Sequence, residues 1–197
     1  PPPQPWGVAD FAACLKALIL QLSIAPCDII AHSFGGRVAL YLAANEPQLV
    51  KRLVLTGCAG IKKPQTPEQQ KRSARYQRLK GLYQSLGRVA PFKGLSDRLL
   101  SELRQKYGSP DYNALSEDMK KTFVKVVNED LSPLLPRVQA STLLVWGEND
   151  TETPLWMGQQ MEKEIPDAGL VIFENDDHFA YLRQWPRFVR VVQAFLK

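Results

Sequence analysis

The chain has 197 residues, of which 45% are hydrophobic and 23% are charged, and this usage is typical of soluble globular proteins. The length allows one domain with an inserted subdomain. No apolar run approaches the roughly twenty residues of a membrane-spanning helix, so we expect no membrane association.

The net charge of +5 is unevenly distributed, because residues 62–125 hold 15 Lys and Arg against 6 Asp and Glu. A basic segment can attract an anionic partner. These arginines are not interleaved with aromatic residues, however, so we expect no nucleic-acid site. The pattern favours a solvated helical surface.

The three cysteines are Cys14, Cys27 and Cys58, and each lies in an apolar segment. Their number is odd, and no pair has the spacing of metal ligands. We therefore expect reduced, buried packing residues in a cytoplasmic protein.

The first part of the chain alternates helical and strand patterns. Apolar residues recur at three- and four-residue spacing over residues 8–22, which predicts an amphipathic helix. The apolar run at 29–31 predicts a buried strand, and the periodic segment after it predicts a helix that ends near Pro47. Residues 53–55 predict a second buried strand.

From residue 61 to residue 136 the pattern is helical and contains no strand. Thr66, followed by Pro67 and Gln69, predicts a capping box that begins one helix. Ser96 and Ser116 are candidate caps of two more helices. We expect residues 61–136 to form a helical cap, inserted into an α/β core of residues 1–60 and 137–197.

Strand patterns return at residues 142–146 and 170–173, with helices predicted over 153–165 and from Trp185 onward. Unbroken apolar strands that alternate with helices indicate a parallel sheet covered on both faces. The predicted fold class is therefore α/β, with a mostly parallel sheet.

A serine lies in the abrupt turn between the first predicted strand and its helix. Ser33 has small residues two positions away on each side, Ala31 and Gly35, as such a strained turn requires. The turn is expected to hold the hydroxyl at the amino end of a helix, where negative charge is favoured. Ser33 is thus the candidate nucleophile.

A serine nucleophile needs a base, and the chain has two histidines. His32 adjoins Ser33 and leaves the strand end in the opposite direction, so we expect it to pack or hydrogen-bond beneath the turn. His178 follows the last predicted strand, at the sheet edge where α/β proteins bind ligands, and is the candidate base.

The base in turn needs an acid that fixes its tautomer. Asp150 follows the strand predicted at 142–146, so it reaches the same sheet edge and is the candidate acid. We expect Asp176 and Asp177 to be solvated loop residues. The competing carboxylates are Glu148, Glu152, Asp176 and Asp177.

Residues 31–36 (Ala-His-Ser-Phe-Gly-Gly) resemble the nucleophile elbow of the α/β-hydrolase superfamily, with alanine in place of the usual first glycine. Residues 146–150 (Trp-Gly-Glu-Asn-Asp) are similar to its acid loop, and residues 177–179 (Asp-His-Phe) to its histidine loop. The order Ser33, Asp150, His178 also matches this superfamily.

The resemblance implies hydrolysis of a small-molecule ester by acyl transfer, without a metal or an organic cofactor. Ser33 is expected to attack the carbonyl, His178 to move the proton, and the backbone N–H of Phe34 to bind the oxyanion. A carboxylesterase is favoured. The alternatives are a hydrolase of carbon–carbon bonds in diketone-type substrates and a non-catalytic ligand-binding or interaction protein.

The superfamily has further strands before the first helix predicted here, and a loop among them supplies a second N–H to the oxyanion hole. No segment of this sequence matches that loop. The resemblance therefore predicts that the natural protein extends before Pro1. A chain without those strands is expected to self-associate through the exposed sheet edge.

Overall fold

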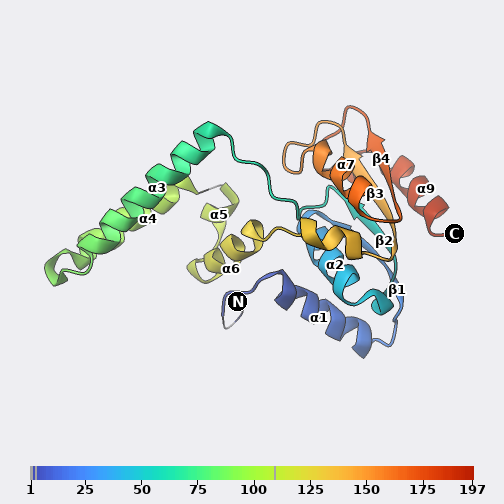
Figure 1. The fold of residues 1–197 in the computed structure, drawn as a ribbon, viewed down its shortest axis with the longest axis horizontal. Coiled ribbons are helices and arrows are strands. Elements are labelled where there is room, and N and C mark those ends of the chain that lie inside the picture. Colours follow the sequence, from blue (N-terminus) through green and yellow to red (C-terminus); the bar gives the residue numbers. More distant parts are fainter. Residues whose placement is uncertain (1, 3, 109) are drawn as a thin grey trace. The chain divides into compact units, whose positions relative to one another are not determined.

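The computed structural model describes residues 2, 4–108 and 110–197, and these contain a four-stranded sheet with helices on both faces (Figure 1). All neighbouring strands are parallel, which confirms the predicted α/β fold class. In spatial order the strands are β1 (Cys27–His32), β2 (Val50–Thr56), β3 (Ser141–Gly147) and β4 (Ala168–Phe173).

The two middle strands are apolar at Leu53–Leu55 of β2 and Leu143–Trp146 of β3, where their side chains alternate between two cores. Leu53 and Leu55 of β2 lie in the larger core, and Val54 lies in the smaller one. The larger core also receives residues of α1 (Val8–Gln21), α2 (Ser33–Asn45) and α7 (Leu155–Glu164). The smaller core is covered by α8 (Ala180–Arg183) and α9 (Trp185–Phe195).

Contacts between Cα atoms divide the chain into two compact units. The helical unit, Lys63–Phe123, contains no strand among its described residues. The sheet unit comprises Pro2–Lys62 and Val124–Lys197. The helices that lie in the helical unit or begin there are α3 (Pro67–Leu86), the 3₁₀-helix η2 (Ala90–Phe92), α4 (Lys93–Tyr107), α5 (Pro110–Ala114) and α6 (Glu117–Asn128).

Residues 124–136, which we expected in the cap, pack instead with the sheet. Leu131 and Leu135 belong to the larger core, and Leu135 lies in the 3₁₀-helix η3 (Ser132–Arg137). The buried Arg37 of α2 donates through Nη1 to the carbonyls of Val126 at 2.6 Å and Glu129 at 2.7 Å. This arginine therefore ties the end of α6 to the helix that follows β1.

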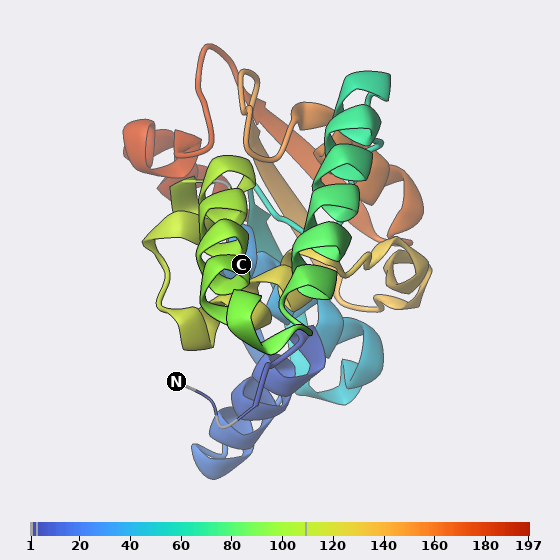
Figure 2. The same cartoon turned by 90° about the vertical axis from the view of Figure 1, so that its left-hand side faces the viewer.

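The helical unit begins as the sequence predicts. The hydroxyl of Thr66 accepts the N–H of Gln69 at 3.2 Å, and the side chain of Gln69 accepts the N–H of Thr66 at 3.0 Å. The prediction of a helix start at Ser96 was wrong, since α4 already contains this residue. Its hydroxyl donates to the carbonyl of Tyr83 at 2.7 Å, which joins α4 to α3 beside it (Figure 2).

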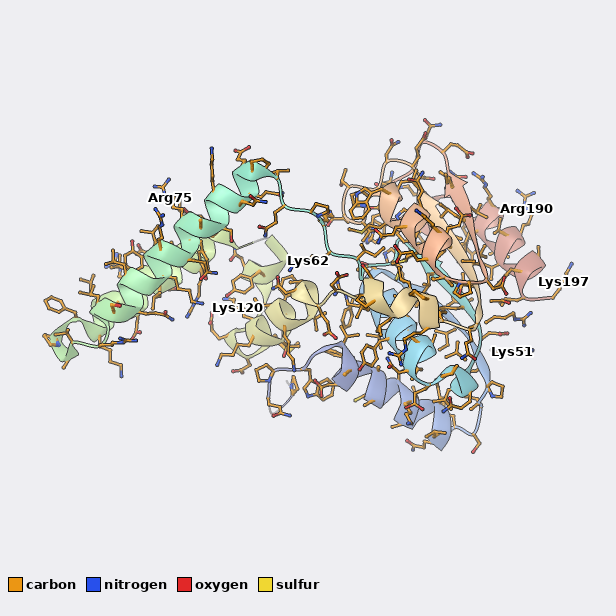
Figure 3. The ribbon with its side chains drawn as sticks, in the orientation of Figure 1. Lys51, Lys62, Arg75, Lys120, Arg190 and Lys197 are labelled. Carbon is orange, nitrogen blue, oxygen red and sulfur yellow. The ribbon has the colours of Figure 1, made fainter. Side chains whose placement is uncertain are left out.

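Helix α3 has no buried residue, although the ring of Tyr76 lies 5.5 Å from that of Tyr107 on α4. Figure 3 labels two of the basic residues of this unit, Arg75 on α3 and Lys120 on α6. Arg75 is exposed, and Lys120 pairs with Glu117. This agrees with the solvated helical surface favoured by the sequence.

The three cysteines are free, but only Cys58 is buried. Cys14 is exposed because α1 turns Val8, Ala12 and Ile19 toward the core and leaves position 14 on another side. Cys27 is partly exposed, so the prediction of three buried cysteines was wrong for two of them. No helix in the described part of the chain is long and apolar enough to cross a bilayer.

Candidate active site

Ser33 is the first residue of α2 and directly follows β1, without an intervening loop. Its φ of 48° lies in the left-handed region, which is a strained conformation for a residue with a side chain. A Cβ added at Gly35 would lie 3.8 Å from the Cβ of Ala31, so the two positions expected to be small do face each other. The structure thus places the serine at the positive end of a helix dipole.

Phe34 is the second residue of α2, so its backbone N–H has no carbonyl partner within the helix. Its ring meets that of Phe11 edge to face, with the centroids 5.1 Å apart. This contact fixes Phe34 against α1 and leaves its N–H beside Ser33 at the start of the helix.

The structure brings His178 and Asp150 together from the loops that follow β4 and β3. Nδ1 of His178 lies 2.8 Å from Oδ2 of Asp150. Because a carboxylate accepts the hydrogen bond, Nδ1 carries the proton and Nε2 keeps its lone pair. The side chain of Asp150 is 0% exposed and that of His178 is 10% exposed.

Two opposing effects act on the carboxyl group of Asp150. Burial raises its pKa, but hydrogen bonds from His178 and Thr153 outweigh burial and leave the pKa below its ordinary value. The group is therefore an anion at neutral pH, as an acceptor for the proton on Nδ1 of His178 must be.

Thr153 orients the acid, although its place in the sequence indicated only a helix start. Its N–H donates to Oδ1 of Asp150 at 2.8 Å, and its Oγ1 lies 2.8 Å from Oδ2. Oγ1 also lies 3.1 Å from the carbonyl oxygen of Gly57. The available signal was the spacing Asp-x-x-Thr, in which a carboxylate accepts an N–H three residues later.

Two glycines allow the backbone to pass close to this pair. A Cβ added at Gly147 would lie 2.1 Å from the carbonyl oxygen of Asp177, so the histidine loop approaches β3 too closely for any side chain. Gly57 has a φ of 46°, and a Cβ there would lie 3.0 Å from Nδ1 of His178 and 3.2 Å from Oδ2 of Asp150. The loop after β2 thus forms one wall of the site.

His32 is packed and hydrogen-bonded beneath the turn, as the sequence predicts. Its Nδ1 lies 3.0 Å from the carbonyl oxygen of Thr56 and 2.9 Å from the hydroxyl of the same residue. Its ring centroid lies 4.6 Å from that of His178. Burial, and then the neighbouring His178, hold the pKa of His32 below its ordinary value.

Among the residues that the structure describes, none of the four competing carboxylates hydrogen-bonds to His178. Asp176 is only 6% exposed and accepts the side-chain N–H of Gln184 at 2.6 Å, so the prediction that it is solvated was wrong. Asp177 pairs with Arg183 at 2.7 Å. The other two competitors, both exposed, are Glu148 and Glu152.

Within residues 2, 4–108 and 110–197, no group of three His, Cys, Asp or Glu side chains is arranged to hold a metal ion. The side chains of the site supply a hydroxyl on a strained turn and an imidazole with a buried carboxylate partner.

Curated relatives of the chain include two kinds of hydrolase. It is 29% identical over 202 residues to a pimeloyl-[acyl-carrier protein] methyl ester esterase of Neisseria meningitidis, which covers 95% of this chain and 75% of that protein. It is 30% identical over 182 residues to a 2-hydroxymuconate semialdehyde hydrolase of Pseudomonas putida, and this match covers 89% of the chain. The chain spans 64% of that second relative, less than two thirds of its length.

Solved structures show the same fold. A hydrolase from Pseudomonas aeruginosa PA01 superposes with a TM-score of 0.68 at 22% identity, over 99% of this chain and 74% of the other. The family model described as the alpha/beta hydrolase fold matches residues 1–183. The chain therefore belongs to the α/β-hydrolase fold family.

Proposed function

We propose that the protein is a serine hydrolase of carboxylic esters, with Ser33 as nucleophile, His178 as base and Asp150 as acid. The observation that carries this proposal is the bond between His178 and Asp150, since it leaves Nε2 of His178 free to take a proton. His178 also packs on His32, the residue directly before Ser33. The proposed base thus contacts the residue that precedes the strained turn.

In this mechanism Oγ of Ser33 attacks the carbonyl carbon of the ester while its proton passes to Nε2 of His178. The carboxylate of Asp150 stabilises the imidazolium that forms. The oxyanion develops at the amino end of α2, where the N–H of Phe34 donates to it. The imidazolium then protonates the leaving alcohol, and a water molecule, activated by the same histidine, releases the acid and restores Ser33.

The relatives support hydrolysis and differ in the bond that they cleave. The name of the Neisseria relative supports a carboxylic ester as the substrate. The name of the Pseudomonas putida relative, at 30% identity, favours the second candidate, a hydrolase of carbon–carbon bonds. Both reactions use a nucleophile, a base and an oxyanion site, so the residues named above serve either one.

We also propose that the helical unit, Lys63–Phe123, is a cap. Its described residues contain no strand and it packs as a compact unit of its own, and both observations support this role. The substrate is proposed to be a small molecule. The three free cysteines support a reducing compartment, and we propose a cytoplasmic location.

The test of the proposal is labelling by a fluorophosphonate together with turnover of a simple aryl ester. Labelling of the wild-type chain at Ser33, identified by peptide mass spectrometry, is expected. Ser33→Ala should lose the label and several powers of ten in kcat, with no change in its unfolding curve. A variant that kept even a tenth of the rate would refute the assignment of the nucleophile.

Two substrates separate the candidate reactions. A methyl ester and 2-hydroxymuconate semialdehyde are compared at equal concentration, and the ester is expected to give the higher kcat/KM. A higher value for the semialdehyde would favour carbon–carbon hydrolysis. A wild-type chain that folds, resists the fluorophosphonate and turns over neither compound would indicate a non-catalytic protein.

A further inference from the structure

His32 precedes the proposed nucleophile in the sequence and packs against the proposed base in space. The planes of the His32 and His178 rings are inclined by 51°, with the centroids 4.6 Å apart. The ring of His32 also lies 4.8 Å from that of Tyr181 and 5.5 Å from that of Phe179. His178 therefore has an aromatic neighbour on β1 in addition to its hydrogen bond to Asp150.

The orientation of the His32 ring is itself fixed by β2. Nδ1 of His32 faces the carbonyl oxygen of Thr56 at 3.0 Å, and β1 and β2 pair these two residues directly. A carbonyl oxygen can only accept a hydrogen bond, so Nδ1 carries the proton of His32. The hydroxyl of Thr56 lies 2.9 Å from the same nitrogen and adds a second partner.

Both polar partners of the His178 ring, Oδ2 of Asp150 at 2.8 Å and Oγ1 of Thr153 at 3.2 Å, meet it at Nδ1, so the ring is free to tilt about that nitrogen. Tilting moves Nε2, the atom that must meet the serine proton, because Nε2 lies across the ring from Nδ1. A displacement of about 1 Å at a reacting group can cost about 10²-fold in rate. A contact against the ring itself restricts this tilt, and His32 provides such a contact.

We infer that His32 is a positioning residue whose ring, oriented by Thr56, restrains the tilt of the His178 imidazole about its bond to Asp150. The inference rests on the proposed function in treating His178 as the base. His32 itself transfers no proton in this scheme.

The charge state of His32 agrees with such a role. The titratable groups around its ring are His178, Asp150 and Tyr181. Burial and the neighbouring His178 hold the pKa of His32 below its ordinary value, so its ring stays neutral near pH 7. Because the ring of His32 carries no charge, it does not compete with the imidazolium of His178 for the carboxylate of Asp150.

Two substitutions test the role of the His32 ring and the role of its hydrogen bond independently. His32→Asn places an amide nitrogen where Nδ1 was and keeps the bond to Thr56, but it removes the ring. His32→Phe keeps a ring and loses the bond. We expect His32→Asn to lower kcat for the aryl ester about 10- to 100-fold with little change in KM. His32→Phe should retain more of the rate than His32→Asn, and Cys14→Ser, an exposed change on α1, should match the wild type.

Nuclear magnetic resonance gives a readout that needs no turnover. The chain has two histidines, so a His32 variant shows a single imidazole, that of His178. In the wild type we expect nuclear Overhauser contacts between the two rings and a protected Nδ1–H signal from His178. In His32→Phe that signal should persist, and in His32→Asn it should broaden and exchange faster with water.

Two results would overturn the inference. One is a wild type without nuclear Overhauser contacts between the two rings. The other is a His32→Asn variant that keeps the wild-type kcat and an unchanged Nδ1–H signal from His178. If His32→Asn fails to fold, the wild-type contacts and the His32→Phe spectrum decide alone. A wild type that folds but has no esterase activity refutes the proposed function, and the spectra then decide the packing role by themselves.

Discussion

Replacing Gly57 by alanine perturbs the pair of His178 and Asp150 without changing either residue. The φ of 46° at Gly57 lies in the left-handed region, where a Cβ costs about 1–2 kcal/mol. The new Cβ would lie 3.0 Å from Nδ1 of His178 and 3.2 Å from Oδ2 of Asp150. Ordinary contacts of this kind are about 3.5 Å or longer, so the atoms must separate by several tenths of an ångström.

Both effects have a measurable consequence. The free energy of unfolding of Gly57→Ala is expected to fall by about 1–3 kcal/mol, from backbone strain and from the crowded contact. Moving a base that is held by a bond of 2.8 Å should lower kcat by about tenfold or more. Urea unfolding followed by circular dichroism measures the first quantity, and hydrolysis of an aryl ester measures the second.

Gly169→Ala is the matched control, because a Cβ added at Gly169 on β4 meets no heavy atom within 4 Å. It should leave kcat unchanged. If Gly57→Ala and Gly169→Ala had the same kcat and the same unfolding curve, the argument that the loop after β2 supports the pair would be wrong.

Three further predictions concern the acid, a buried cation and the pH dependence of stability. Asp150→Asn should lower kcat by about 10⁴-fold, because the amide no longer fixes the tautomer of His178, whereas Asp177→Asn should lower kcat only slightly. A larger loss of kcat in Asp177→Asn than in Asp150→Asn would show that the acid is misassigned. Arg37→Met should lower the free energy of unfolding by about 2–4 kcal/mol, since it leaves the buried carbonyl of Val126 and the partly buried carbonyl of Glu129 without their donor. An unchanged midpoint in urea would contradict this. The pKa of His32 lies below its ordinary value of 6.5, so in this pH range the unfolded chain binds more protons than the native one. The contribution of His32 to the free energy of unfolding is therefore fully present above pH 6.5 and is lost as the pH falls through the folded pKa. Between pH 7 and pH 5.5, urea midpoints should therefore fall less steeply in His32→Phe than in the wild type, and equal slopes would count against a depressed pKa.

The sequence by itself predicted the order of the main elements and the turn that carries Ser33. These features are local: an apolar run of strand length, a helical period and small residues beside a serine each act over a few neighbours. The capping box at Thr66 was predicted for the same reason, because its two partners are three residues apart. The carboxyl ends of parallel strands meet at one edge, so the sequence also indicated that Asp150 and His178 would lie near each other.

Short elements and burial were predicted less well. Helices α5 and α8 are too short to show a period, and neither was expected. Ser96 looked like a cap, yet its hydroxyl serves a contact between α4 and α3. We expected Asp176 to be solvated because it lies in a loop. It is buried because this loop folds against β3 and α8 and gives it Gln184 as a partner.

Only the tertiary structure decided which residues surround the proposed base. The contact of His32 with His178 and the approach of Gly57 to the same imidazole join segments that are more than a hundred residues apart in the chain. Such contacts depend on strand order and register, and a local pattern does not encode either one. The sequence therefore determined which groups are present at the sheet edge, and the packing of β1 beside β2 and of β2 beside β3 decided how the base is held.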